Sequence, residues 1–170
     1  MRVNRLTIVN TILLYTPNTL YSKFAFKDKI KEESYGFKNM KSNEELLNIA
    51  KEASLSAYCP YSEFPVGACV LYESENVYSG CNVENASYGL SLCAERNAMS
   101  TAVASGEKSK LLKIAIFSPK SSLCFPCGAC RQWIQEFAQG YNTEIILEDE
   151  NGNIQIYYIN DILPHSFKLL

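Results

Sequence analysis

The 170-residue chain contains one histidine, His165, so any metal site must be built mostly from sulfur or carboxylate ligands. An excess of positive charge is also lacking, because sixteen Lys and Arg residues stand against eighteen Asp and Glu residues. Proteins that bind duplex DNA are usually basic, so this balance disfavours a nucleic-acid polymer as the partner. No apolar run approaches the roughly 18 residues that a membrane-spanning helix needs, so no membrane partner is expected.

Cysteine, by contrast, is abundant. The chain has seven cysteines, and an odd number argues against a closed disulfide framework. Three of them, Cys124, Cys127 and Cys130, are spaced three residues apart, which indicates metal chemistry in a reducing compartment and predicts a cytoplasmic protein. The length and the 47% content of hydrophobic residues indicate a single globular domain.

Residues 1–39 differ in charge from the rest of the chain. They carry seven basic and three acidic residues, and no acidic residue precedes Asp28. Two interpretations of this N-terminal extension stay open: an upstream extension of the gene model, with Met40 as the true start, or an organellar targeting segment. The expected domain is residues 40–170.

From Met40 onward the pattern alternates between helical and strand periodicity. Ser42 and Glu45 form a capping box that opens a helix with an apolar face reaching Leu55. The elements expected after it are strands 66–72 and 77–84, helix 90–105, strand 113–118, helix 128–139, and strands 144–148 and 154–158. This order predicts an α/β fold in which helices cover the faces of one mixed sheet.

The most informative spacing combines Cys93-x-Glu95 with Cys127-x-x-Cys130. Residues three apart at the start of a helix lie on one face, and the positive end of the helix favours the thiolate that binds metal. Cys93 can supply a third thiolate by the same logic. Three protein ligands leave a fourth tetrahedral position for water, as in catalytic zinc sites, and Glu95 is close enough to exchange protons with that water.

Three alternatives compete with a catalytic zinc site. Cys127 and Cys130 alone could form a redox pair, although this leaves Cys93-x-Glu95 unexplained. The cysteine run also imitates part of an iron–sulfur motif, but Ile134 stands where the next cysteine is expected. A closed four-cysteine zinc module could recruit Cys124, which leaves Glu95 without a role. We therefore predict that Cys124 is not a ligand.

The larger pattern resembles the small homotetrameric, zinc-dependent cytidine deaminases. The segments that carry this resemblance, in order, are YSEFPVGA (61–68), NVENASY (82–88), CAER (93–96), PCGACRQ (126–132) and ILPHSF (162–167). The likeness covers about residues 40–167 without large insertions. The resemblance implies a cytidine deaminase catalytic domain with a three-layer α/β/α fold and one mixed five-stranded sheet.

The resemblance also implies roles at the metal. Cys93, Cys127 and Cys130 correspond to the zinc ligands, and Glu95 to the residue that carries protons between water and substrate. Arg96 has a separate physical argument. Three thiolates and Zn²⁺ sum to a charge of −1, and a guanidinium that donates hydrogen bonds to a ligand sulfur offsets this charge.

Four further residues correspond to substrate contacts. Phe64 is expected to pack against the pyrimidine, the backbone N–H of Ala94 to hold the base, and Asn82 and Glu84 to bind the ribose 3′-hydroxyl. The implied reaction converts cytidine and deoxycytidine into uridine and deoxyuridine plus ammonia, in pyrimidine salvage. Another aminopyrimidine such as blasticidin S is the alternative substrate.

The segment just before the zinc motif departs from the family pattern. Cys124-Phe125 precedes Pro126 where relatives more often carry small polar residues. We expect Phe125 to alter the wall of the pocket.

Overall fold

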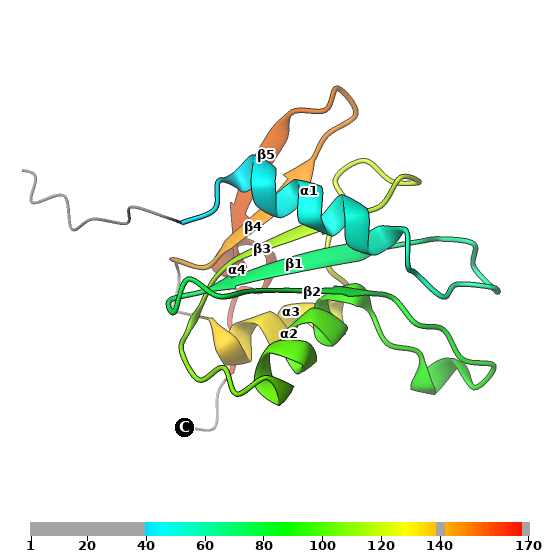
Figure 1. Cartoon of the computed structure of the whole chain (residues 1–170), viewed down its shortest axis with the longest axis horizontal. Coiled ribbons are helices and arrows are strands. Elements are labelled where there is room, and N and C mark those ends of the chain that lie inside the picture. Colours follow the sequence, from blue (N-terminus) through cyan, green and yellow to red (C-terminus); the bar gives the residue numbers. More distant parts are fainter. Residues whose placement is uncertain (1–39, 139–141, 168–170) are drawn as a thin grey trace, which may run out of the picture. The chain divides into compact units, whose positions relative to one another are not determined.

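The computed structural model describes residues 40–138 and 142–167, so the N-terminal extension predicted for residues 1–39 lies outside the described residues. The elements are shown in Figure 1. They are α1 (Asn43–Ser54), β1 (Gly67–Tyr72), β2 (Val77–Cys81), η1 (Tyr88–Leu90), α2 (Ala94–Ala104), β3 (Leu111–Phe117), α3 (Gly128–Phe137), β4 (Glu144–Glu148), β5 (Ile154–Tyr158) and α4 (Ile159–Ile162).

The five strands form one sheet in the order β2-β1-β3-β4-β5. The pair β3–β4 is parallel, with Lys113 opposite Glu144, and the other neighbouring strands are antiparallel. The connection between the parallel strands contains α3, as expected for a crossover between parallel neighbours. The predicted mixed five-stranded sheet is therefore confirmed.

Helices cover both faces of this sheet (Figure 1). On one face, α1 buries Leu46, Leu47 and Ala50 against side chains of β1, β3 and β4. On the other face, α2 buries Ala98 and Met99 in a second cluster, to which α3 contributes the buried residue Ile134. This arrangement is the three-layer α/β/α fold that was predicted.

The largest differences from the predicted boundaries are in two elements, and both lie beside the site. Residues 90–93 do not belong to α2. Leu90 ends η1, and after it Leu92 and Val83 exchange two backbone hydrogen bonds of 2.9 Å that keep the chain extended up to Cys93. As a result, α2 begins at Ala94 and Cys93 is its N-cap. Strand β2 ends at Cys81 rather than at residue 84, because the carbonyl of Asn82 accepts from the N–H of Tyr58.

The apolar face of α1 was also predicted one residue too long. Leu55 is the C-cap of the helix, and 87% of its surface is exposed. The short C-terminal helix α4 was not predicted. One turn of helix is too short to show a periodic pattern.

Gly67 sits where α1 crosses the start of β1, and we expect Gly67→Ala to destabilise the domain. A Cβ at this position would lie 1.9 Å from the carbonyl oxygen of Ala50 and 2.5 Å from the amide nitrogen of Ser54, both backbone atoms of α1. Overpacking of this kind costs about 1–3 kcal/mol or more, which denaturant unfolding measures directly. Gly89→Ala is the control, since a Cβ at Gly89 meets nothing within 4 Å. Equal stability of the two variants would contradict this packing.

Candidate active site

The N-termini of α2 and α3 bring three cysteines together. Cys93 is the N-cap of α2, Cys127 is the N-cap of α3, and Cys130 lies in the first turn of α3. Neither N-cap side chain bonds its own helix, so both thiols are available to a ligand. The three sulfur atoms lie within 4.8 Å of one another. The structure thus joins the three cysteines that the sequence singled out.

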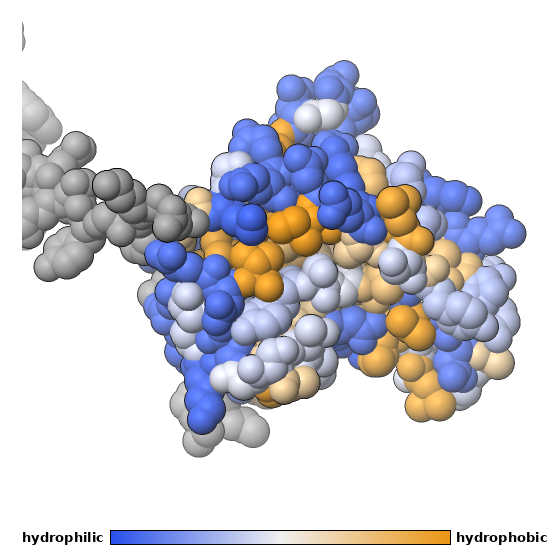
Figure 2. All heavy atoms as spheres, in the orientation of Figure 1, coloured by the Kyte–Doolittle hydropathy of each residue, from blue (hydrophilic) through white to orange (hydrophobic). Residues whose placement is uncertain are grey.

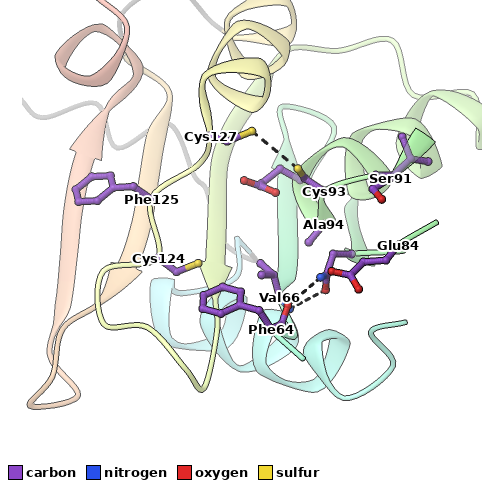
Figure 3. A pocket seen from close by; sticks show the side chains of 12 residues that line it. Phe64, Val66, Glu84, Ser91, Cys93, Ala94, Cys124, Phe125 and Cys127 are labelled. Atoms are coloured by element: carbon purple, nitrogen blue, oxygen red, sulfur yellow. Dashed lines mark hydrogen bonds between the residues drawn. The ribbon is translucent and has the colours of Figure 1, made fainter. Parts of the chain in front are cut away.

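The spacing of the sulfur atoms fits a zinc ion. Two thiolates on a tetrahedral zinc, each about 2.3 Å from the metal, lie about 3.8 Å apart, and the Sγ atoms of Cys93 and Cys127 are 3.9 Å apart. Among the described residues, Cys124 is not a member of this cluster. In Figure 3 its sulfur lies apart from those of Cys93 and Cys127. The donor set is therefore three thiolates with a fourth position open.

Hydrogen bonds and charge hold Cys93 in the form that binds metal. The thiol of Cys130, followed by the guanidinium of Arg96, lowers the pKa of Cys93 to about 5, although burial acts in the opposite direction. The pKa of Cys130 is raised, first by its hydrogen bond to Cys93 and then by burial. Arg96 donates to the carbonyl of Ser91 at 3.0 Å and to the sulfur of Cys93 at 3.6 Å. The expected contact between Arg96 and a cysteine of the cluster is present.

Glu95 follows Cys93 by two residues in the sequence. It is the second residue of α2, only 4% of its surface is exposed, and it lines the same cavity as Cys93 and Cys127. Burial, and secondarily the charge of Cys93, raise the pKa of Glu95 to about 7. A carboxyl group in this position can accept and return a proton near neutral pH.

The cavity beside the cluster has a volume of about 250 Å³. All four residues predicted to contact substrate, Phe64, Asn82, Glu84 and Ala94, line it. Figure 3 labels three of them, Phe64, Glu84 and Ala94. Ala94 is the first residue of α2, and N–H groups in the first turn of a helix have no partner within the helix. The structure therefore places the predicted base and sugar contacts around one cavity.

The cavity also contains residues that sequence reasoning missed. Ser91 and Leu92 line it although no motif marks them, and Val66 lines it although the motif of residues 61–68 gave it no role. Phe125 lines the cavity as expected, but its ring packs edge-on against Tyr157 of β5, with 4.8 Å between the centroids. Figure 3 shows the ring of Phe125 directed away from the cluster. Its main contact is therefore with β5.

The fold and the site together define a class of enzyme. Zinc-dependent deaminases of nucleobases and nucleosides bind zinc through three cysteines, or through one histidine and two cysteines, beside a glutamate that is not a ligand. Here a three-cysteine cluster with an open fourth position stands beside the buried carboxyl group of Glu95. The protein is accordingly a zinc-dependent deaminase.

Comparisons with known proteins specify the family. Residues 40–145 match the family model described as the cytidine and deoxycytidylate deaminase zinc-binding region. A cytidine deaminase of Sporosarcina psychrophila is 40% identical over 124 residues, which are 73% of this chain and 90% of the relative. One from Halalkalibacterium halodurans is 39% identical over 122 residues, covering 72% of this chain and 91% of the relative.

Solved structures agree with the sequence relatives. The crystal structure of cytidine deaminase from Burkholderia pseudomallei matches with a TM-score of 0.70 and 39% identity, over 75% of this chain and 100% of that chain. The structure from Mycobacterium tuberculosis matches with a TM-score of 0.64 and 38% identity, over 74% and 97%. The chain belongs to the cytidine and deoxycytidylate deaminase family. Within residues 40–138 and 142–167, no helix combines the length and apolar character needed to cross a membrane.

Proposed function

We propose that this protein hydrolyses cytidine and deoxycytidine to uridine and deoxyuridine, releasing ammonia, as a step of pyrimidine salvage. The observation that carries the proposal is the buried carboxyl group of Glu95 beside the three-cysteine cluster, in a cavity that Phe64 and Asn82 also line. The relatives named cytidine deaminase, which match over about nine-tenths of their own length, support the same substrate.

In this proposal, Cys93, Cys127 and Cys130 hold zinc, and Glu95 moves the protons. When bound, zinc lowers the pKa of water so that hydroxide is available near neutral pH. Glu95 takes a proton from the attacking water and delivers it to N3 of the cytosine ring. It then takes the proton of the hydroxyl group now on C4 and delivers it to the amine, so that the C4–N bond breaks, ammonia leaves and the C4 carbonyl forms. Its burial keeps this exchange away from bulk solvent.

The remaining cavity residues hold the nucleoside. The ring of Phe64 packs against the pyrimidine, and the backbone N–H of Ala94 donates to the base. Asn82 and Glu84 bind the ribose 3′-hydroxyl, so free cytosine is expected to be a poor substrate. A requirement for the ribose 3′-hydroxyl favours cytidine over blasticidin S, which carries no ribose. The position of Cys124 outside the thiol cluster disfavours a closed four-cysteine module.

Arg96 balances the charge of the metal site, and we expect Arg96→Gln to weaken it. The guanidinium contacts the sulfur of Cys93 at 3.6 Å, and loss of such an outer contact typically costs about 10–100-fold in metal affinity or activity. Zinc affinity by chelator competition, together with kcat on cytidine, measures the effect. The control is Lys120→Gln, on the loop after β3. Arg131→Gln does not serve as a control, because Arg131 donates to backbone carbonyls near the site. Unchanged zinc affinity and turnover in Arg96→Gln would contradict this role.

We also propose a cytoplasmic homotetramer. All seven cysteines are free thiols, as expected in a reducing compartment. Large apolar side chains are exposed on the segments that flank the cavity, and Figure 2 shows hydrophobic residues at that end of the molecule. The exposed large apolar side chains on these segments are Leu55, Tyr58, Tyr61, Val83, Tyr88, Leu90 and Leu92. Exposed patches of this kind mark interfaces, and light scattering after gel filtration tests the assembly.

The ultraviolet absorbance of cytidine tests the proposed activity. Purified protein of known zinc content is incubated with cytidine, with and without a chelator. We expect the cytidine band to disappear when about one zinc is bound per chain, since each chain supplies one three-thiolate site. The chelator is expected to stop the reaction. No turnover with zinc fully bound would overturn the proposed substrate and direct the search to other aminopyrimidines.

A further inference from the structure

The side chain of Asn82 takes the place of a backbone group in the sheet. Beyond the last β1–β2 pair, the N–H of Asn82 still donates to the carbonyl of Val66 at 3.1 Å, but its own carbonyl accepts from Tyr58. The N–H of Val66 donates instead to Oδ1 of Asn82 at 2.8 Å. The amide nitrogen Nδ2 of Asn82 donates to the carbonyl of Phe64 at 2.9 Å. One side chain therefore extends the ladder along the segment that carries Phe64.

Glu84 binds the preceding part of the same segment. Its Oε2 accepts from the N–H groups of Tyr61 at 2.9 Å and Ser62 at 3.2 Å. The N–H of Phe64 donates to the hydroxyl of Ser62 at 3.1 Å. The Ser62 hydroxyl, followed by the N–H of Tyr61, lowers the pKa of Glu84, so its carboxylate stays charged at neutral pH. Together, Asn82 and Glu84 hold residues 61–66 by their backbone.

This segment needs such support. Glu63, immediately before Phe64, has a left-handed backbone with φ of 51°. Conformations of this kind are sparsely populated for residues other than glycine, and they persist where the surrounding contacts hold them. Phe64 itself is only half-buried, so packing alone does not fix its ring. The direction in which Phe64 enters the cavity therefore depends on the hydrogen bonds that the segment makes with the side chains of Asn82 and Glu84.

We propose that Asn82 and Glu84 are positioning residues for Phe64, in addition to any contact they make with the sugar. The proposal rests on the proposed function, because it concerns how the pyrimidine is held. The same two side chains then serve both to place the base, through Phe64, and to recognise the sugar. Loss of Asn82 then affects substrates that lack the sugar hydroxyl as well as those that carry it.

A substrate without the 3′-hydroxyl separates the two roles. We compare kcat/KM for cytidine and for 3′-deoxycytidine in the wild type, in Asn82→Ala and in the control Asn151→Ala, an exposed amide in the β4–β5 turn. A shift of a positioning side chain such as Phe64 by about 1 Å can lower the rate by as much as about 10²-fold. We expect Asn82→Ala to lower kcat/KM at least about tenfold on both substrates. A loss on cytidine with none on 3′-deoxycytidine would overturn the positioning role.

A second pair of variants guards against misfolding of Asn82→Ala. Glu84→Ala removes the acceptor for two backbone N–H groups, whereas Glu84→Gln keeps a side-chain oxygen. We expect Glu84→Gln to restore part of the activity on 3′-deoxycytidine that Glu84→Ala loses. In Phe64→Ala, replacing Asn82 should cost little more on this substrate. Full additivity of the two substitutions would contradict coupling through Phe64.

Amide hydrogen exchange tests whether Asn82 holds residues 61–66, and it needs no measurement of turnover. In Asn82→Ala, the amides of residues 61–64 and of Val66 should exchange faster than in the wild type, while those of β3 stay protected. Unchanged exchange over residues 61–66 would overturn the proposal even if cytidine is the substrate. A wild-type protein that fails to deaminate cytidine would instead overturn the proposed function, so the two failures are distinguishable.

Discussion

Replacing Glu95 with glutamine should leave zinc in place and lower cytidine turnover by at least about 10²–10⁴-fold, the range for a positioned acid–base group. Glutamine preserves the size of the side chain and its buried position in α2. It cannot accept a proton from water or return one to N3 and the leaving amine. The loss is therefore expected in kcat rather than in KM or in metal content.

Single-turnover kinetics and zinc analysis of the same samples test this expectation. Glu52→Gln is the matched control, because Glu52 is an exposed glutamate on α1, across the sheet from the site. Near-normal turnover in Glu95→Gln would remove Glu95 from the mechanism. Loss of zinc together with activity would show that Glu95 supports the metal site instead of moving protons.

Replacing Cys130 with alanine should abolish zinc binding and activity, whereas Cys124→Ala should retain about one zinc per chain, as expected if three thiolates form the site. Cys130 is fully buried and belongs to the sulfur cluster, so its loss leaves two ligands. Cys124 is half-buried outside that cluster, and burial raises the pKa of its thiol to about 11. Its place outside the sulfur cluster is the reason why Cys124→Ala is expected to keep zinc.

Metal analysis by atomic emission and thermal unfolding with and without added zinc compare the two variants. Wild-type protein treated with chelator provides the reference for a metal-free site. Loss of zinc in Cys124→Ala would place Cys124 in the fourth position and restore the closed four-cysteine module as the interpretation. Full zinc occupancy in Cys130→Ala would show that the three-thiolate site is wrong.

Local sequence patterns were sufficient to predict most of the helices and strands. The capping box of Ser42 and Glu45 is present in the structure, and Leu46 and Ala50 are buried as their helical spacing predicts. The order of helices and strands is confirmed apart from η1 and α4. These features depend on residues within one or two turns of each other, which periodicity and turn chemistry report directly.

The candidate site was predictable for a similar reason. Cys127 and Cys130 share the first turn of α3, and Glu95 follows Cys93 at the start of α2, so each half of the site is local. The resemblance to a known family then predicted which other residues would accompany them. The structure places Phe64, Asn82, Glu84 and Ala94 around the cavity beside these cysteines, and their contacts with the substrate stay predictions.

What the sequence by itself determined is therefore the set of reactive groups and the elements that carry them. The tertiary structure alone decided that Cys93 and Cys127, 34 residues apart, meet while Cys124 does not. It also decided that pairing with Val83 keeps Leu92 out of the helix, and that the amide of Asn82 bonds the Phe64 segment. These outcomes depend on contacts between distant segments, and no local pattern reports them because they form only when the sheet and both helices are assembled.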